Sequence, residues 1–273
     1  MHTYAMQISP IMNYTAGAKG GDALAAMPEG LLVDRRWLKA HGAARPTVDY
    51  YLRSGRLKAV ARGVYRRPGP ALKWQHVVYS LGELNYRVHV GGRSALELRG
   101  LAHYLPLGGV QRIDLFSESP LPAWVTKTDW PVRFVLHGEK LFTELPAEAL
   151  TAEPFGHWDW PIPFATWELA LLELAAGVRD VHGFDYADKL FEGASVLRPD
   201  LVRALLLGCR SVHAKRVFLW FARRHSHEWW QQLDTSDVDL GRGKRMLVRG
   251  GVLDKEFLIT VPREMAHDEQ PLY

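Results

Sequence analysis

The sequence has one cysteine, Cys209, among its 273 residues. A lone thiol cannot form an internal disulfide, so a disulfide-stapled scaffold is excluded. The chain also lacks any apolar run close to the roughly 20 residues that cross a bilayer. Its first residues have neither a basic segment nor a continuous apolar one, so we expect no signal peptide and a cytoplasmic protein.

Acidic residues are nearly missing from one segment of the chain. Residues 31–73 contain Asp34 and Asp49 against eleven lysines and arginines, a net charge of +9. The whole chain carries +4, so the remainder carries −5. Lysine and arginine usually lie on the solvated surface, but this does not explain why acidic residues avoid the segment. Segregation of this kind is typical of a protein that binds a polyanion.

The same segment has the pattern of a helix-turn-helix. Asp34 is a suitable N-cap for a first helix, and Gly42 is suited to the position after its end. Pro46 lies where a second helix begins, because a first-turn proline loses no hydrogen bond. Val48 and Tyr51 mark the buried face of that helix. Two short helices joined by a turn of three or four residues form this motif.

A β-hairpin follows the two helices. Residues 57–60 and 64–67 alternate as strands around the tight turn 61–63, and a Pro-Gly-Pro sequence then interrupts the pattern. Strands in this position form the wing of a winged helix-turn-helix. We also expect a short helix over residues 22–27.

The chain as a whole is predicted to be α+β, with a winged helix-turn-helix followed by a larger mixed domain. We expect a loose extension over 1–20, the winged domain over 21–72 and the larger domain over 73–273. In the larger domain, residues 132–136 resemble a strand and 165–176 an apolar helix. Its last third is predicted to be mainly helical.

The second helix of a helix-turn-helix lies in the major groove, where side chains read base edges. We expect its exposed face to present Arg45, Thr47, Tyr50 and Arg53 to the bases. Asp49 is not expected to read bases, since phosphates repel a carboxylate unless it accepts a hydrogen bond from a cytosine amine or pairs with an arginine. Phosphate contacts are expected from the first helix and the wing, namely from Arg35, Arg36, Lys39, Lys58, Arg62, Arg66 and Arg67. The alternative is a winged domain that contacts protein.

Several short motifs in the same order resemble the AbiEi-type antitoxins of type IV toxin–antitoxin and abortive-infection systems. No single motif is specific, and the resemblance rests on their order and spacing after residue 30. They are the segment from Leu31 through Ala40-His41-Gly42, Tyr51–Leu57, Arg62–Tyr65, Val90–Gly100, Lys215–Leu219, Asp239–Arg245 and Ile259–Pro262.

This resemblance implies a transcriptional autorepressor that binds repeats in its own promoter and takes part in phage defence. It also implies a C-terminal domain that counteracts a nucleotidyltransferase toxin, directly or indirectly. Neither enzymatic activity nor a cofactor is expected, and the partners would be duplex DNA and the toxin, with no membrane.

A second basic group lies near the C-terminus. It is a candidate surface for an acidic partner, either the toxin or additional DNA, and the alternative is a solvated helix side. The glycines at 241 and 243 would let backbone N–H groups approach a phosphate, but the spacing is not that of a Walker loop. The group contains Lys215, Arg216, Arg223, Arg224, Arg242, Lys244 and Arg245.

The main alternative function is a metal-dependent nuclease with a winged DNA-binding domain. Asp114, Glu118, Glu139 and Lys140 have the residue types of such a core, although their order is loose. A metal site at the histidines of residues 225–228, with His213 upstream, is not expected, because their spacing does not place them on one helix face.

Overall fold

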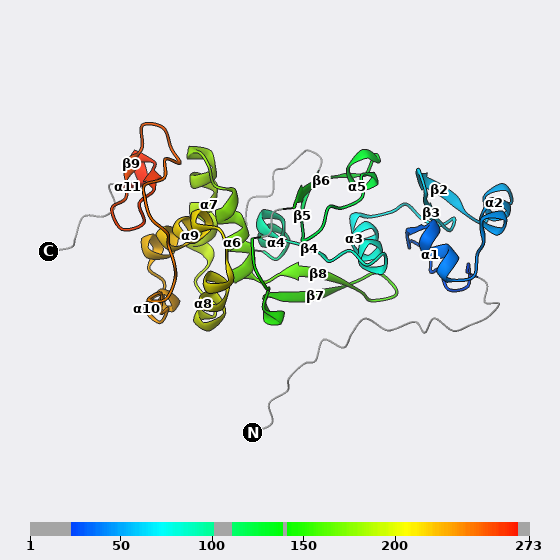
Figure 1. Cartoon of the computed structure of the whole chain (residues 1–273), viewed down its shortest axis with the longest axis horizontal. Helices are drawn as coiled ribbons and strands as arrows, with labels where there is room; N and C mark the ends of the chain where they lie inside the picture. Colours follow the sequence, from blue (N-terminus) through cyan, green and yellow to red (C-terminus); the bar gives the residue numbers. More distant parts are fainter. Residues whose placement is uncertain (1–22, 101–110, 139–140, 267–273) are drawn as a thin grey trace, which may run out of the picture. The chain divides into compact units, whose positions relative to one another are not determined.

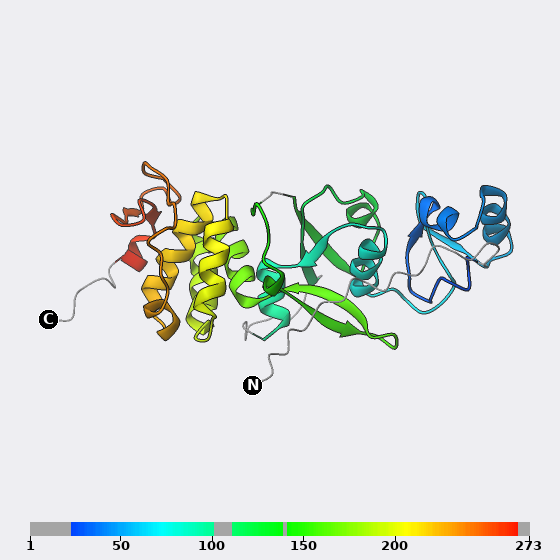
Figure 2. The same ribbon diagram turned by 60° about the horizontal axis from the view of Figure 1, so that its bottom comes forward.

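The computed structural model describes residues 23–100, 111–138 and 141–266 (Figures 1 and 2). The chain divides into two compact units between Asn85 and Tyr86. In the described residues, no helix has the length and apolar character needed to cross a membrane.

The N-terminal unit has the helices and strands that the sequence predicts for a winged helix-turn-helix. Its three-stranded antiparallel sheet has the order β1-β3-β2. The Asp34 carboxylate caps the first helix by accepting the Trp37 N–H at 2.7 Å, and Gly42 has a φ of 89°. The elements are β1 (Val33–Asp34), α1 (Arg35–Ala40), α2 (Arg45–Arg53), β2 (Lys58–Ala61), β3 (Val64–Arg66) and α3 (Trp74–Glu83).

The prediction of a helix over residues 22–27 is wrong for the described residues, because residues 23–26 form turns. Pro28 follows immediately and disfavours helical backbone at Met27, which is fully buried.

Helix α3 follows the boundary expected at residue 72 but lies on the N-terminal side of the observed division. The Leu32 N–H donates to the Ser80 hydroxyl of α3 at 2.8 Å, and both residues are buried. This bond joins α3 to the segment that leads into β1. A functional boundary at residue 72 stays a prediction.

The C-terminal unit contains a mixed five-stranded sheet with the order β6-β5-β4-β8-β7. Pairs β5–β6 and β4–β8 are parallel, whereas β4–β5 and β7–β8 are antiparallel. Figures 1 and 2 show β7 and β8 as a hairpin that extends beyond the other strands. The strands are β4 (Val88–Val90), β5 (Gln111–Ser117), β6 (Val132–His137), β7 (Leu150–Phe155) and β8 (Trp160–Ala165).

The described chain after the sheet is mainly helical, so the predicted α+β class is confirmed. Helix α6 packs against α4 and α9, and α9 is buried from His213 to Ala222. Short elements also occur: α4 (Gly92–Leu98), α5 (Trp124–Lys127), a 3₁₀ turn (Ala147–Ala149), α10 (Glu228–Gln231), β9 (Val252–Leu253), β10 (Thr260–Val261) and α11 (Arg263–Ala266). The longer helices are α6 (Trp167–Gly177), α7 (Val181–Gly193), α8 (Pro199–Gly208) and α9 (Val212–His225).

Candidate nucleic-acid interface

Helix α2 has one buried and one exposed face, as its sequence predicts. Val48 and Tyr51 are buried, whereas Arg45 and Arg53 are exposed at its two ends. Tyr50 between them is 53% exposed, an unusual state for a large aromatic side chain. Thr47 is half-buried. The structure therefore places the four predicted base-reading residues on α2 with their side chains wholly or partly accessible.

Asp49 interrupts this face but lies near an arginine of the preceding helix. Its Oδ1 atom is 3.7 Å from an Arg35 guanidinium nitrogen. Arg35 also donates from Nε to the Tyr65 hydroxyl at 2.9 Å, and this hydrogen bond raises the pKa of Arg35 above its ordinary value. Because Arg35 spans α1, α2 and β3, it links the two helices to the wing.

Six other predicted contacts have cationic side chains that form no ion pair with any described residue. They come from α1, α2 and the wing, and all are exposed. Exposed cations without carboxylate partners can bind phosphates without first breaking an internal contact. They are Arg36, Lys39, Arg45, Arg53, Lys58 and Arg62.

Arg66 and Arg67 were predicted to contact phosphates, but in the structure both donate hydrogen bonds to backbone carbonyls of the chain itself. Arg66 donates to the backbone carbonyls of Gly69 and Pro70, at 3.0 and 2.8 Å. Arg67 donates to the carbonyl of Met27 at 3.1 Å. Both guanidinium groups therefore hold the chain around the wing, and a phosphate contact from either stays untested. The Pro-Gly-Pro sequence could have indicated the contacts of Arg66, because the carbonyls of such a turn have no partners within a helix or strand.

The basic group near the C-terminus is not one accessible surface, and that expectation is wrong for Lys215 and Arg216. Their exposed fractions are 5% and 1%. Arg216 donates from Nε to the Leu240 carbonyl and from a terminal nitrogen to the Gly243 carbonyl, each at 2.7 Å. It thereby fixes the following loop, because α9 is buried around its circumference and its cations must find internal acceptors.

The other members of the group fall into two sets. Arg223 pairs with carboxylates at residues 254 and 256, and Arg224 pairs with Asp188. By contrast, Arg242, Lys244 and Arg245 are exposed. A partner surface at these three residues stays a prediction.

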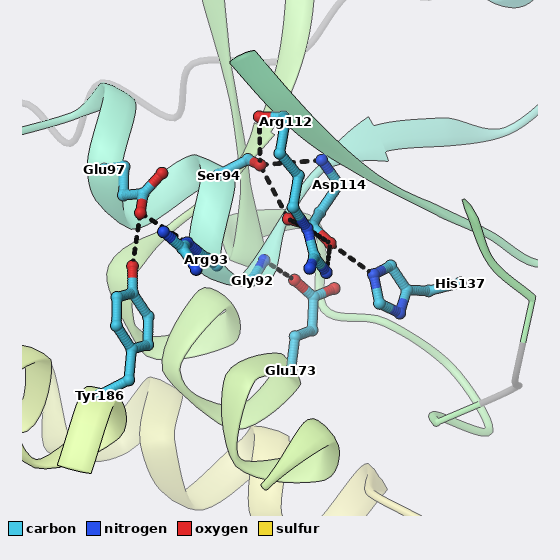
Figure 3. A network of polar contacts seen from close by, with 9 residues as sticks. All are labelled: Gly92, Arg93, Ser94, Glu97, Arg112, Asp114, His137, Glu173 and Tyr186. Carbon is cyan, nitrogen blue, oxygen red and sulfur yellow. Dashed lines mark hydrogen bonds and ion pairs between the residues drawn. The ribbon is translucent and has the colours of Figure 1, made fainter. Parts of the chain in front are cut away.

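The nuclease alternative depends on Asp114, which is 1% exposed. Its carboxylate accepts hydrogen bonds from Arg112 and Ser94 and lies 2.7 Å from His137 Nε2 (Figure 3). Burial alone would raise the pKa of Asp114, but the contacts with His137 and Arg112 outweigh it and hold the pKa below its ordinary value. A carboxylate used in this way stabilises the packing of α4 on β5 and β6 and has little capacity left for a metal ion.

The remaining residues of that alternative do not join Asp114. Glu118 is exposed after β5, and Glu139 and Lys140 lie outside the described residues. Among residues that the structure describes, no three histidine, cysteine or acidic side chains are grouped to hold a metal ion. His225 and His227 contact Asp188 and the Phe191 carbonyl instead.

Sequence reasoning missed a second buried carboxylate beside Asp114. Glu173 of α6 accepts the Gly92 N–H at 2.8 Å and lies 2.7 Å from His89 Nε2. His89, Phe116 and His137 occupy paired positions on three adjacent strands. Their rings stack with centroid separations of 5.7 and 4.3 Å. No local motif joins these residues, because the contacts of Glu173 span more than 80 positions and the ring contacts span 27 and 21.

Comparison with known families gives two matches that together cover most of the chain. Residues 19–107 match the family described as "Transcriptional regulator, AbiEi antitoxin N-terminal domain". Residues 110–262 match "Transcriptional regulator, AbiEi antitoxin, Type IV TA system". No curated protein matches the chain.

Proposed function

Because this chain belongs to the AbiEi family of antitoxins, the transcriptional regulators of type IV toxin–antitoxin systems, we propose that it represses its own promoter. In this proposal α2 reads bases in the major groove of operator repeats, while α1 and the wing bind phosphates. Arg45, Thr47, Tyr50 and Arg53 are the proposed base readers. Repression follows when the bound protein occupies the promoter.

The observation that carries this proposal is the set of six exposed cations on α1, α2 and the wing that form no ion pair within the described part of the chain. Residues 1–85 contain twelve basic and five acidic residues, a net charge of +7. Residues 86–273 contain 22 basic and 25 acidic residues, a net charge of −3. A winged domain that served only to contact protein would not need this separation of charge.

The proposal assigns the second role, counteraction of a nucleotidyltransferase toxin, to the C-terminal unit. The exposed loop residues Arg242, Lys244 and Arg245 are the proposed contact if neutralisation is direct. The role requires no catalysis by this chain, in line with the engagement of Asp114 by Arg112 and His137.

The DNA proposal can be tested with two double variants that change the net charge equally. Lys58→Gln with Arg62→Gln removes two exposed wing cations, whereas Arg242→Gln with Lys244→Gln removes two exposed cations of the C-terminal unit. Binding to the duplex upstream of the gene is measured by fluorescence anisotropy from 50 to 300 mM salt. Each lost phosphate contact should lower the slope of log affinity against log salt by about one.

We expect the wing variant to lose affinity and about two units of slope, and the loop variant to resemble the unaltered protein. Weak, salt-insensitive binding by the unaltered protein would contradict the DNA proposal. Equal losses in the two variants would contradict the placement of the interface on the winged domain. Growth of cells that express the toxin with either variant tests the loop contact separately, since a direct contact predicts loss of protection only for the loop variant.

A further inference from the structure

A loop between α10 and β9 surrounds the buried guanidinium group of Arg216. Nε of Arg216 donates to the Leu240 carbonyl at 2.7 Å, and its two terminal nitrogens donate to the carbonyls of Gly243 and Gly241 at 2.7 and 3.2 Å. Arg216 is 1% exposed, and in the described part of the chain its hydrogen-bond partners are backbone carbonyls rather than carboxylates. A buried cation normally has a counter-ion, because carbonyl oxygens solvate its charge without neutralising it.

These carbonyl contacts determine where the backbone N–H groups of the loop point. In a trans peptide bond, the C=O of one residue and the N–H of the next lie in one plane and point in opposite directions. The carbonyls of Gly241 and Gly243 point toward Arg216, so the N–H groups of Arg242 and Lys244 point away from it. Neither of these N–H groups donates to an acceptor among the described residues. Two backbone donors of the loop are therefore directed outward.

Two glycines permit this backbone path. Gly241 and Gly243 have φ angles of 62° and 80°, a region that residues with a side chain rarely adopt. A Cβ at Gly243 would meet nothing within 4 Å, so the space beside it is open to a ligand. N–H groups that follow one another in such a backbone form anion-binding concavities. The Gly241 N–H in the same loop donates to the Asp239 carboxylate at 2.7 Å, so the loop already binds one oxyanion of its own chain.

The side chains of the loop add positive charge around these donors. Residues 239–245 contain three cations, at 242, 244 and 245, and one acidic residue, Asp239, a net charge of +2 that Arg216 beneath them raises to +3. The three loop cations are exposed. Burial and the charge of Arg245 lower the pKa of Arg216 below its ordinary value, against a smaller opposing effect of Asp239. Positive charge is therefore in excess at this loop.

From this geometry we infer that the loop of residues 239–245 binds the phosphate chain of a small polyphosphate. Phosphate oxygens accept the N–H groups of Arg242 and Lys244, and the exposed cations neutralise the rest of the chain. A single phosphate group carries a charge of about −1.5 to −2 at neutral pH, so a di- or triphosphate matches the charge of the loop better. A nucleoside triphosphate and inorganic tripolyphosphate share this chemistry. The proposed toxin contact uses side chains of the same loop, but the inference requires neither that contact nor DNA binding.

The first test separates the backbone donors from the charged side chains. Binding of inorganic tripolyphosphate, ATP and adenosine to the full-length protein is measured by isothermal titration without divalent cations. Gly243→Ala keeps every cation but disfavours the backbone path that directs the N–H groups outward. Gly156→Ala is the matched control, because Gly156 has a φ of 73° and a Cβ there also meets nothing within 4 Å.

The second test locates the site with the two double variants of equal charge described above. Arg242→Gln with Lys244→Gln removes two cations of the loop, whereas Lys58→Gln with Arg62→Gln removes two cations of the wing. We expect the loop variant to lose affinity for tripolyphosphate and the wing variant to keep it. Loss of affinity in the wing variant alone would overturn the inference.

Tripolyphosphate and ATP should each bind with a Kd below about 1 mM, and adenosine should not bind. Gly243→Ala should weaken binding about tenfold, the effect of losing a hydrogen bond to a charged group, and Gly156→Ala should leave it unchanged. Tighter binding of ATP than of tripolyphosphate would identify a nucleotide as the ligand, and equal affinity would identify the phosphate chain alone. If Gly243→Ala does not fold, the amide resonances of Arg242 and Lys244 in the unaltered protein decide, because tripolyphosphate should shift them.

Failure of both polyphosphates to bind would overturn the inference, as would equal affinity for adenosine. Equal affinities of Gly243→Ala and Gly156→Ala would also overturn it, since binding would then depend on side-chain charge alone. Amide resonances of Arg242 and Lys244 that do not move would have the same meaning. These measurements contain neither DNA nor toxin, so the proposed regulatory function can fail or hold independently.

Discussion

At the scale of single residues, the partners of each charged group distinguish structural from functional side chains. Arg216 and Arg53 both lie on helices and are indistinguishable by residue type. Arg216 is 1% exposed and binds backbone carbonyls, whereas Arg53 is exposed at the end of α2 without an ion pair in the described residues. All three guanidinium nitrogens of Arg216 donate to backbone carbonyls, whereas the exposed guanidinium of Arg53 is accessible to a ligand.

Arg45 should determine sequence preference more than overall affinity. Arg45→Ala removes a side chain that can bind guanine with two hydrogen bonds, worth about 1–3 kcal/mol of discrimination. We expect relaxed preference at one operator position, measured by selection from a randomised duplex library. Arg36→Ala on α1 is the control, because losing a phosphate contact should weaken all sequences alike. If Arg45→Ala kept full preference, Arg45 would not read bases.

Asp114 should make stability depend on pH in the acid range. Its folded pKa lies below its ordinary value, so the folded state binds fewer protons there than the unfolded state. The stabilisation is therefore complete above the unfolded pKa of about 3.9 and is lost as pH falls through the lower folded pKa.

Replacement of Asp114 by asparagine should destabilise the fold by about 2 kcal/mol at neutral pH, because Arg112 and His137 lose their shared acceptor. The loss of stability on acidification should also become smaller. Urea midpoints from pH 7 to pH 3 measure both effects, and the exposed Asp129→Asn is the control. Identical pH profiles for Asp114→Asn and the unaltered protein would contradict this role.

At the scale of elements, the turn between β4 and α4 has space only for glycine. A Cβ at Gly91 would lie 2.2 Å from Glu173 Oε2 and 2.6 Å from a ring carbon of Phe116. Gly91→Ala should therefore displace Glu173 from the Gly92 N–H and lower the free energy of unfolding by about 1–3 kcal/mol. Chemical denaturation measures the change. Gly177→Ala, where a Cβ meets nothing within 4 Å, should cost little; equal effects would contradict the explanation.

Local signals in the sequence were sufficient to predict the helix-turn-helix, because caps and turns involve neighbouring residues. Asp34 bonds to Trp37, three positions away. The five-stranded sheet could not be predicted in the same way, since β4 pairs with β8 through Val90 and Phe164. The inward direction of Arg216 was equally unpredictable, because its carbonyl partners lie 24–42 positions further along the chain.

At the scale of the whole molecule, the two units carry net charges of opposite sign, +7 and −3. The sequence predicted a basic segment at residues 31–73, and the division of the chain at Asn85 comes from the structure. The sequence could not show which cations form ion pairs, because the two side chains of an ion pair are brought together only by the fold. Arg223 and Arg224 illustrate this, since their acidic partners come from distant segments.

The pairing of β4 with β8 has a mechanical consequence. The register between these strands consists of Val90 and Phe164, whereas β5–β6 and β7–β8 each pair over six positions. Strands β6, β5 and β4 therefore form one part of the sheet and β8 and β7 the other, and a single residue pair joins the two parts. A local opening can separate them while the other strand pairs stay intact. Hydrogen–deuterium exchange should be faster at the backbone amides next to Val90 and Phe164 than in the middle of β5, and uniform exchange across the five strands would contradict this.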